Sequence, residues 1–362
     1  MPDPADLRRP AVATTWMSAL ALGFAVAVMA KRPLAPARRS AQAGDAAAPS
    51  AGGEGRGAAS PTELTARNWR DILWRVFGEI SKDRVLAVAA GVTFYALLAI
   101  FPAVTALVSL YGLVADPATI SDQLNALGGL LPSGALDIIG EQVKHIAAKP
   151  HSSLGFGFAA GLAVALWSTN AGMKALFDAL NVVYEEQEKR SFIKLNAVSL
   201  LCTLGALVVI LLALGAVVVI PVVLNLVSLG PAFEAVLSLV RWPLLLGLIV
   251  LALAVLYRLG PSRRAPRWRW VTWGSGVAAL GWVIGSMLFS WYVAKFGTYN
   301  ETYGSLGAVI GFMTWIWIST TIVLIGAEIN AEMEHETAAD TTVGSGQPRG
   351  RRGAAMADKV AV

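Results

Sequence analysis

The sequence predicts an all-α, polytopic membrane protein built around a bundle of six transmembrane helices. Its 362 residues are 56% hydrophobic and only 15% charged, whereas about a quarter of the residues of soluble domains are charged. After residue 84 there are also six long apolar segments, each able to supply the roughly 20 residues that a helix needs to cross a bilayer. These segments are 85–115, 153–183, 197–224, 241–257, 270–293 and 305–330.

The distribution of Lys and Arg predicts the orientation of this six-helix core. Basic residues concentrate before the first segment, in every second loop after it, and in the C-terminal tail. Because positively charged loops stay on the cytoplasmic side, both ends of the core are expected in the cytoplasm, and the protein in a bacterial inner membrane. The formal net charge of +5 then follows from topology, and no nucleic-acid partner is expected.

The N-terminal 62 residues precede the core and differ from it in composition. Residues 1–32 hold an apolar run, 14–30, of marginal spanning length with basic residues on both sides, and we expect a tail with an extra membrane anchor there. Residues 33–62 are rich in Ala, Gly, Pro and Ser, which predicts a disordered linker. The tail 336–362 is expected to be disordered and cytoplasmic on the same grounds.

Residues 63–335 form the predicted membrane domain, and an amphipathic helix opens it. In the stretch 62–84, apolar residues recur at helical spacing with Arg and Asp between them. This pattern is typical of a helix that lies on the membrane surface. Membrane lipids are therefore the expected partners.

The second segment contains an unusual polar stripe in "LWSTNAGMKALFDALNVVYEE" (166–186). On a helix that turns 100° per residue, Asn170, Lys174, Asp178 and Asn181 fall on one face about 80° wide, and Lys174 and Asp178 can pair at i, i+4. Ionisable residues inside a membrane generally face a cavity or the bundle interior. The stripe either lines a path for substrate or protons, or binds this helix to its neighbours.

Other polar groups are predicted at a similar depth. Arg258, next to Tyr257, ends the fourth segment and Glu328 lies near the end of the sixth, so these two charges could join Lys174 and Asp178 in one neutral cluster. In the first segment Pro102 lacks an amide hydrogen and predicts a kink, with Tyr95 on its inner side.

Small residues at four-residue spacing predict close helix packing, either within the bundle or in a homo-oligomer. The glycines in these pairs are Gly157, Gly161, Gly281, Gly285, Gly307 and Gly311. The single cysteine and three histidines show no metal-ligand spacing, and no phosphate-binding loop or catalytic serine motif appears. We therefore expect no metal, no cofactor and no enzymatic activity.

Several stretches together resemble the YihY/BrkB family of bacterial inner-membrane proteins. They include "AAGVTFYALLAIFPAVTALVSLYG", the stripe segment, "LYRLGPSRRAPRWRWVTWGSGVAALGW", "FSWYVAKFGTYNETYGSLGAVIGFMTWIWI" and "LIGAEINAE". The resemblance covers residues 65–335 and implies the six-helix fold. The family has no settled activity, and some members carry a ribonuclease label. A nuclease needs metal-binding carboxylates or an acid and base pair in an aqueous groove, which these short basic loops lack, so we reject that label.

Two functional hypotheses remain. In the first, the protein is a transporter or flippase-like protein for a lipid, small solute or ion, without an ATPase of its own. Lys174 and Arg258 would meet an anionic group, and Asp178 or Glu328 would hold these cations or carry a proton. The residues expected to line the path are Tyr95, Asn170, Lys174, Asp178, Asn181, Tyr257, Arg258 and Glu328. In the second hypothesis, the protein is a non-transporting scaffold that maintains the cell envelope.

Overall fold

A computed structural model describes residues 58–111, 156–227, 231–296 and 305–359 of the chain, all within one compact unit, 52–362. In these residues every regular element is a helix, so the predicted all-α class is confirmed. The extra anchor expected in residues 1–32 and the first part of the linker, 33–57, lie outside the described residues.

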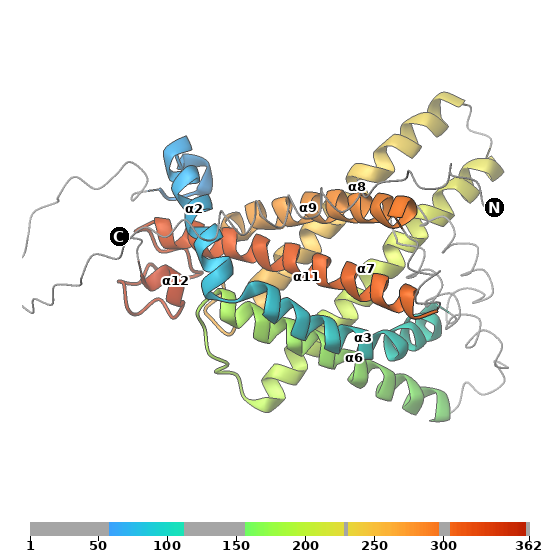
Figure 1. The fold of residues 1–362 in the computed structure, drawn as a ribbon, viewed down its shortest axis with the longest axis horizontal. Coiled ribbons are helices and arrows are strands. Elements are labelled where there is room, and N and C mark those ends of the chain that lie inside the picture. The colour runs from blue at the N-terminus through green and yellow to red at the C-terminus, as the bar shows by residue number, and fades with distance from the viewer. Residues whose placement is uncertain (1–57, 112–155, 228–230, 297–304, 360–362) are drawn as a thin grey trace, which may run out of the picture. The chain divides into compact units, whose positions relative to one another are not determined.

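Six long helices coincide with the six apolar segments, and Figure 1 shows their arrangement. Four of them, α7, α8, α9 and α11, are long and apolar enough to cross a membrane, and the bent pair α2 and α3 could supply a fifth crossing. The described part of α6 is not among these candidate spans. The six helices are α3 (Val85–Tyr111), α6 (Phe156–Val183), α7 (Phe192–Val227), α8 (Pro231–Leu259), α9 (Trp268–Phe296) and α11 (Ser305–Glu336).

The predicted amphipathic helix is α2 (Ala66–Lys82). Thr65 caps its first turn by accepting a hydrogen bond from the backbone of Asn68, and this satisfies one of the free amides at a helix start. Ile72 is buried whereas Trp74, on the opposite face, is 69% exposed. A turn at residues 83–84, with Arg84 at φ 52°, sets α2 at 62° to the start of α3.

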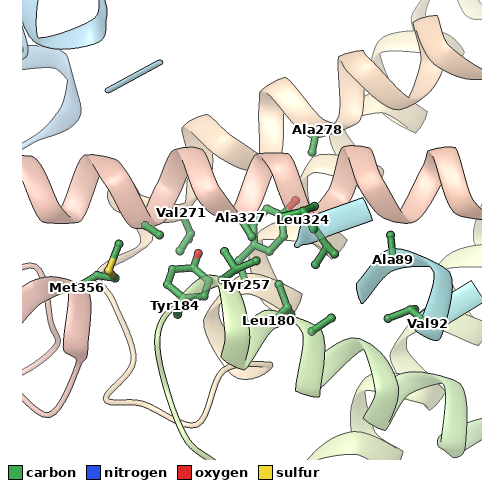
Figure 2. Packing of buried hydrophobic residues seen from close by; sticks show 14 of the residues in the cluster. Ala89, Val92, Leu180, Tyr184, Tyr257, Val271, Ala278, Leu324, Ala327 and Met356 are labelled. Carbon is green, nitrogen blue, oxygen red and sulfur yellow. The ribbon is translucent and has the colours of Figure 1, made fainter. Parts of the chain in front are cut away.

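The core of the unit lies where α3, α6, α8, α9 and α11 meet. Figure 2 shows buried side chains from these helices around Tyr184 and Tyr257. Contacts are most extensive between α3 and α6 and between α9 and α11. Burial of this apolar cluster stabilises the arrangement at roughly 25 cal/mol for each Å² removed from solvent.

The α9–α11 contact confirms close packing for two of the predicted glycines. A Cβ atom on Gly281 would lie 3.2 Å from Ile322, and one on Gly285 would lie 2.8 Å from the same side chain. Gly161 and Gly311 do not make such a contact within the bundle, because an added Cβ would meet nothing within 4 Å; a homo-oligomer contact at these glycines stays a prediction. Sequence spacing identifies a small-residue face but does not say which helix faces it.

For the remaining two glycines of these pairs, close packing stays a prediction. Gly307 is buried in α11, and Gly157 belongs to the first turn of α6, whose side chains are outside the described residues. The helix α3 is assigned without interruption through Pro102, and the kink there stays a prediction.

The tightest crossing of α9 and α11 lies elsewhere and was not predicted. At Gly326 an added Cβ would lie 2.6 Å from Ala278 and 2.7 Å from the hydroxyl of Tyr257. Asn330 reinforces this crossing, since its side chain accepts from the backbone amide of Gly274 at 2.8 Å. The two helices therefore touch through their backbones.

The predicted disorder of the tail 336–362 is wrong for residues 337–359. This segment folds back and ends in the short helix α12 (Ala355–Asp358), which lies at the same end as α2 (Figure 1). Arg352 is 5% exposed and donates hydrogen bonds to the carbonyls of Gln347, Ala339, Ala357 and Ala338. The tail is ordered although its residues are mostly polar, because Arg352 donates hydrogen bonds to backbone carbonyls that would otherwise lack a partner. The predicted disorder of the linker is likewise wrong for its last residues, 58–62, where Ala58 and Pro61 are buried.

Candidate functional site

Two of the four residues of the predicted polar stripe face α7 and form a polar seam with it. We use "polar seam" for Asn170 and Lys174 of α6 together with Asn196, Ser199 and Thr203 of α7. Thr203 donates to Asn170 at 3.3 Å, and Lys174 donates to Asn196 at 3.0 Å. All of these residues except the half-buried Lys174 are at least 94% buried.

One buried donor in the seam lacks a partner. Asn170 is fully buried, and its Nδ2 makes no hydrogen bond in the structure. The ammonium of Lys174 also lies 5.5 Å from the ring centre of Trp167, a distance at which a cation is attracted to the aromatic face. The seam therefore offers one free amide donor beside one cation.

The predicted pairing of Lys174 with Asp178 is not present, because the lysine turns to Asn196 instead. Asp178 is exposed, and its charged neighbours are Glu188, Arg190 and Lys174. It lies at the edge of the 80° stripe, where a small rotation of the helix moves a side chain out of the contact with α7.

Asn181 serves as an anchor for two loops. It accepts a hydrogen bond from the backbone of Ser262 at 2.7 Å and donates to Glu188 at 3.3 Å. Arg190 binds Glu188 at 2.7 Å and donates to the carbonyl of Gly260 at 2.7 Å. The hydrogen bond from Arg190 lowers the pKa of Glu188 to about 2, so this carboxylate is ionised at neutral pH.

Three of the other predicted residues lie outside the seam. Tyr257 is fully buried and donates to the backbone carbonyl of Val323 at 2.6 Å, which joins α8 to α11. Arg258 lies 4.5 Å from the ring centre of Trp268, and its Nη1 is buried without a hydrogen bond. Tyr95 is 48% exposed and its ring contacts only Phe94 among the described aromatic side chains.

Glu328 is buried, as its position in an apolar helix predicts, but its neighbours are different from those expected. Its side chain is fully buried, and neither carboxylate oxygen makes a hydrogen bond. The charged groups that act on it include Asp83, Glu332, Glu79 and Lys82. The predicted cluster of Lys174, Asp178, Arg258 and Glu328 is therefore wrong, because Glu328 faces the turn between α2 and α3.

A buried ion pair fixes the loop after α8 to the end of α11. Arg263 and Glu334 are 1% and 0% exposed and form two hydrogen bonds of 2.8 and 2.9 Å. Thr341 of the tail donates to the same carboxylate at 2.9 Å, and the guanidinium lies 4.0 Å from the ring centre of Tyr184. Bidentate pairs of this kind are the ones that a protein interior tolerates, although Arg263 Nε is buried without a hydrogen-bond partner.

The sequence contained a signal for half of the polar seam that our prediction missed. Asn196, Ser199 and Thr203 are spaced at i, i+3 and i+7 in an otherwise apolar segment, so they share one helical face. Asp83, in contrast, follows an exposed helix, and only the folded chain brings it to Glu328. Among the described residues no group of three or more His, Cys, Asp or Glu side chains could hold a metal ion.

Comparison with known proteins gives a consistent result. The family model described as "Virulence factor BrkB" matches residues 76–350. "Putative ribonuclease-like protein YfkH" of Bacillus subtilis is 30% identical over 247 residues, which is 67% of this chain and 88% of that protein. A UPF0761 membrane protein of Haemophilus influenzae is 25% identical over 274 residues, or 75% of this chain and 97% of that protein.

No solved structure matches the fold. The family match nevertheless covers the amphipathic helix α2 in part, all six long helices and most of the ordered tail. The apolar helices and this match agree, and the chain therefore belongs to the virulence factor BrkB family of multi-pass integral membrane proteins.

Proposed function

We propose that this protein is a transporter or flippase-like protein of the bacterial inner membrane, built on six transmembrane helices with both ends of the core in the cytoplasm. It moves a lipid or small solute that carries an anionic group, and it does so without an ATPase of its own. The polar seam between α6 and α7 is the place where that group binds.

The observation that supports this proposal is the unpartnered donor of Asn170 beside Lys174. A buried amide donor without a partner costs about 1–3 kcal/mol, and a cation in an apolar helix is also unfavourable. Both costs fall when an anionic oxygen accepts from Asn170 Nδ2 and lies near Lys174. Phosphate and carboxylate groups of lipids and metabolites have this chemistry.

A scaffold function is the second candidate, and a specific observation favours it. Several predicted path residues are already engaged in helix packing: Asn181 binds loop backbone, and Tyr257 binds α11. A protein whose polar groups serve only to join helices would show the same two contacts. It would not need the free donor of Asn170.

The name of the Bacillus relative contains the words ribonuclease-like, and those words describe that relative. For the present chain we propose no enzymatic activity, no cofactor and no nucleic-acid partner. The polar groups that support transport lie between apolar helices, where an RNA strand has no access.

Reconstitution into lipid vesicles tests the proposal. The full chain is incorporated into vesicles that contain a fluorescent anionic phospholipid, and its movement between leaflets is followed by chemical quenching from outside. Parallel vesicles hold an entrapped anionic dye, and its efflux is followed. We expect one of these signals to exceed that of protein-free vesicles and to fall at least about tenfold in Lys174→Gln, which corresponds to about 1.4 kcal/mol of lost interaction.

The matched control is Lys194→Gln, the same change at an exposed lysine in the first turn of α7. This control should keep the wild-type signal. If Lys174→Gln also keeps it, the seam is not the binding place. If neither lipid nor dye moves faster than in protein-free vesicles, the scaffold hypothesis replaces transport.

A further inference from the structure

The second unusual feature of the structure is the carboxyl group of Glu328, which is buried without a counterion. Lys82, a cation that acts on it, and Arg75 are both already bound to other acids. Lys82 pairs with Glu79 at 2.8 Å and Glu185 at 3.4 Å, and Arg75 pairs with Glu332 at 2.6 Å. An isolated carboxylate in such surroundings is strongly disfavoured. The charge of Glu328 must therefore be neutralised by a bound proton or by a bound cation that is not a side chain.

Asp83 is the charged group with the largest effect on Glu328. It is the half-buried C-cap residue of α2, at the 62° turn into α3. Burial, together with the nearby carboxylate of Glu79, raises the pKa of Asp83 to about 6. Because two adjacent carboxyl groups resist ionising together, one proton between them relieves the repulsion.

Tyr184 supplies an independent observation near Glu328. Its side chain is fully buried, its hydroxyl makes no hydrogen bond, and it is among the groups that interact electrostatically with Glu328. Figure 2 shows this hydroxyl pointing towards α11, the helix that carries Glu328. A buried hydroxyl without a hydrogen bond, like that of Tyr184, indicates that a further hydrogen-bonding group can bind next to it.

We propose that Glu328 and Asp83 form a proton-binding pair, in which Glu328 holds an exchangeable proton and Asp83 passes it to and from the aqueous surface. The position of the residues supports this direction of exchange. Asp83 lies beside the exposed Lys82 and the half-buried Glu79, whereas Glu328 on α11 is fully buried. The pair would couple the proposed transport to a proton gradient, and this coupling rests on the proposed function.

A proton fits the site better than a metal ion. Glu328 and Asp83 provide two carboxyl groups, and no third acidic, His or Cys ligand completes a metal-binding group among the described residues. The remaining charged neighbours, Glu79, Glu332 and Glu185, are engaged with Lys82, Arg75 and Lys359. A shared proton needs only the pair itself.

Infrared spectroscopy of the purified full chain tests the pair directly. At neutral pH ordinary carboxyl groups are ionised, so a protonated carboxylic acid gives a separate carbonyl band that shifts on exchange into heavy water. We expect this band in the wild-type protein and its loss in Glu328→Gln. In Asp83→Asn the band should remain but move, because the ionisable carboxyl group next to Glu328 has been replaced by a neutral amide.

The control is Asp71→Asn, which removes a partly exposed carboxyl group of α2 that pairs with Arg70 at the surface and should leave the band unchanged. The proposal is overturned if the wild-type protein has no such band, if the band survives Glu328→Gln, or if replacing choline chloride with sodium chloride removes it. Where Glu328→Gln does not fold, the wild-type band and its shift in Asp83→Asn still decide the question. A band without flux in vesicles would refute transport alone, and flux without a band would refute the proton pair alone.

Discussion

Substitution of one partner in the buried Arg263–Glu334 pair should destabilise the protein more than any surface substitution. Arg263→Met removes the cation and leaves the Glu334 carboxylate fully buried, with only the hydroxyl of Thr341 donating to it among the side-chain contacts described above. Breaking such a pair typically costs about 3–5 kcal/mol, because the remaining charge is not compensated. The upper part of this range is expected here, since both side chains are essentially inaccessible to water.

The same cost predicts how the double variant behaves. Arg263→Met combined with Glu334→Leu removes both charges together, so neither is left buried alone. Replacing a whole buried pair with apolar groups is often nearly neutral. The double variant should therefore be more stable than Arg263→Met by about 2 kcal/mol or more.

Thermal unfolding in detergent measures these differences. At about 2–4 °C for each kcal/mol, a cost of about 4–5 kcal/mol in Arg263→Met should lower the apparent midpoint by about 8–20 °C. The matched control is Arg70→Met, which breaks a pair with Asp71 whose side chains are 69% and 45% exposed and which should cost at most about 1 kcal/mol. Our reasoning is refuted if Arg263→Met is no less stable than the control, or if the costs of the two single variants simply add in the double variant.

Three further predictions use the same unfolding assay. The Arg190 hydrogen bond lowers the pKa of Glu188 from 4.5 to about 2. The stabilisation from this ionised carboxylate is therefore complete above pH 4.5 and is lost as the pH falls towards 2. In Glu188→Gln the loss of stability in acid should be smaller, and an unchanged acid profile would contradict this prediction. Gly326→Ala should lower the free energy of unfolding by about 1–3 kcal/mol, because its Cβ would overlap Ala278. Gly276→Ala, with open space around the glycine, should not lower it. Equal unfolding midpoints for the two variants would show that α9 and α11 separate easily. Deletion of residues 337–362 should lower the midpoint by several degrees because it uncovers the buried core, and an unchanged midpoint would mean that the tail only rests on the surface.

The elements of the fold could be predicted well from the sequence because their signals are local. Apolar runs predicted the long helices, and the spacing around Ile72 and Val76 predicted an amphipathic α2. The order of residues 337–359 could not be predicted in this way. It depends on contacts with residues far away in the sequence, such as the hydrogen bond from Thr337 to the carbonyl of Ala58 and that from the amide of Ala355 to Glu186, which no local pattern reveals.

The candidate site was predicted in part for a similar reason. Helical spacing placed Asn170 and Lys174 on one face, and the structure confirms that this face is polar and shared. Spacing alone does not fix how one helix is rotated against another. Glu328 therefore has the expected burial but lies against the turn at Asp83, and Asp178 is exposed at the edge of its stripe.

The position of Met356 has a consequence for synthesis of the protein. This side chain belongs to the same buried cluster as Val85, Tyr184, Tyr257 and Leu324 (Figure 2), although it lies 271 residues after the first of them by the numbering. The helices that are inserted first therefore remain in the membrane with this part of the core incomplete until α12 has been synthesised. Completion of the core is a late, post-insertion step, and a nascent chain that stalls before Met356 would present an unfinished core to quality-control proteases.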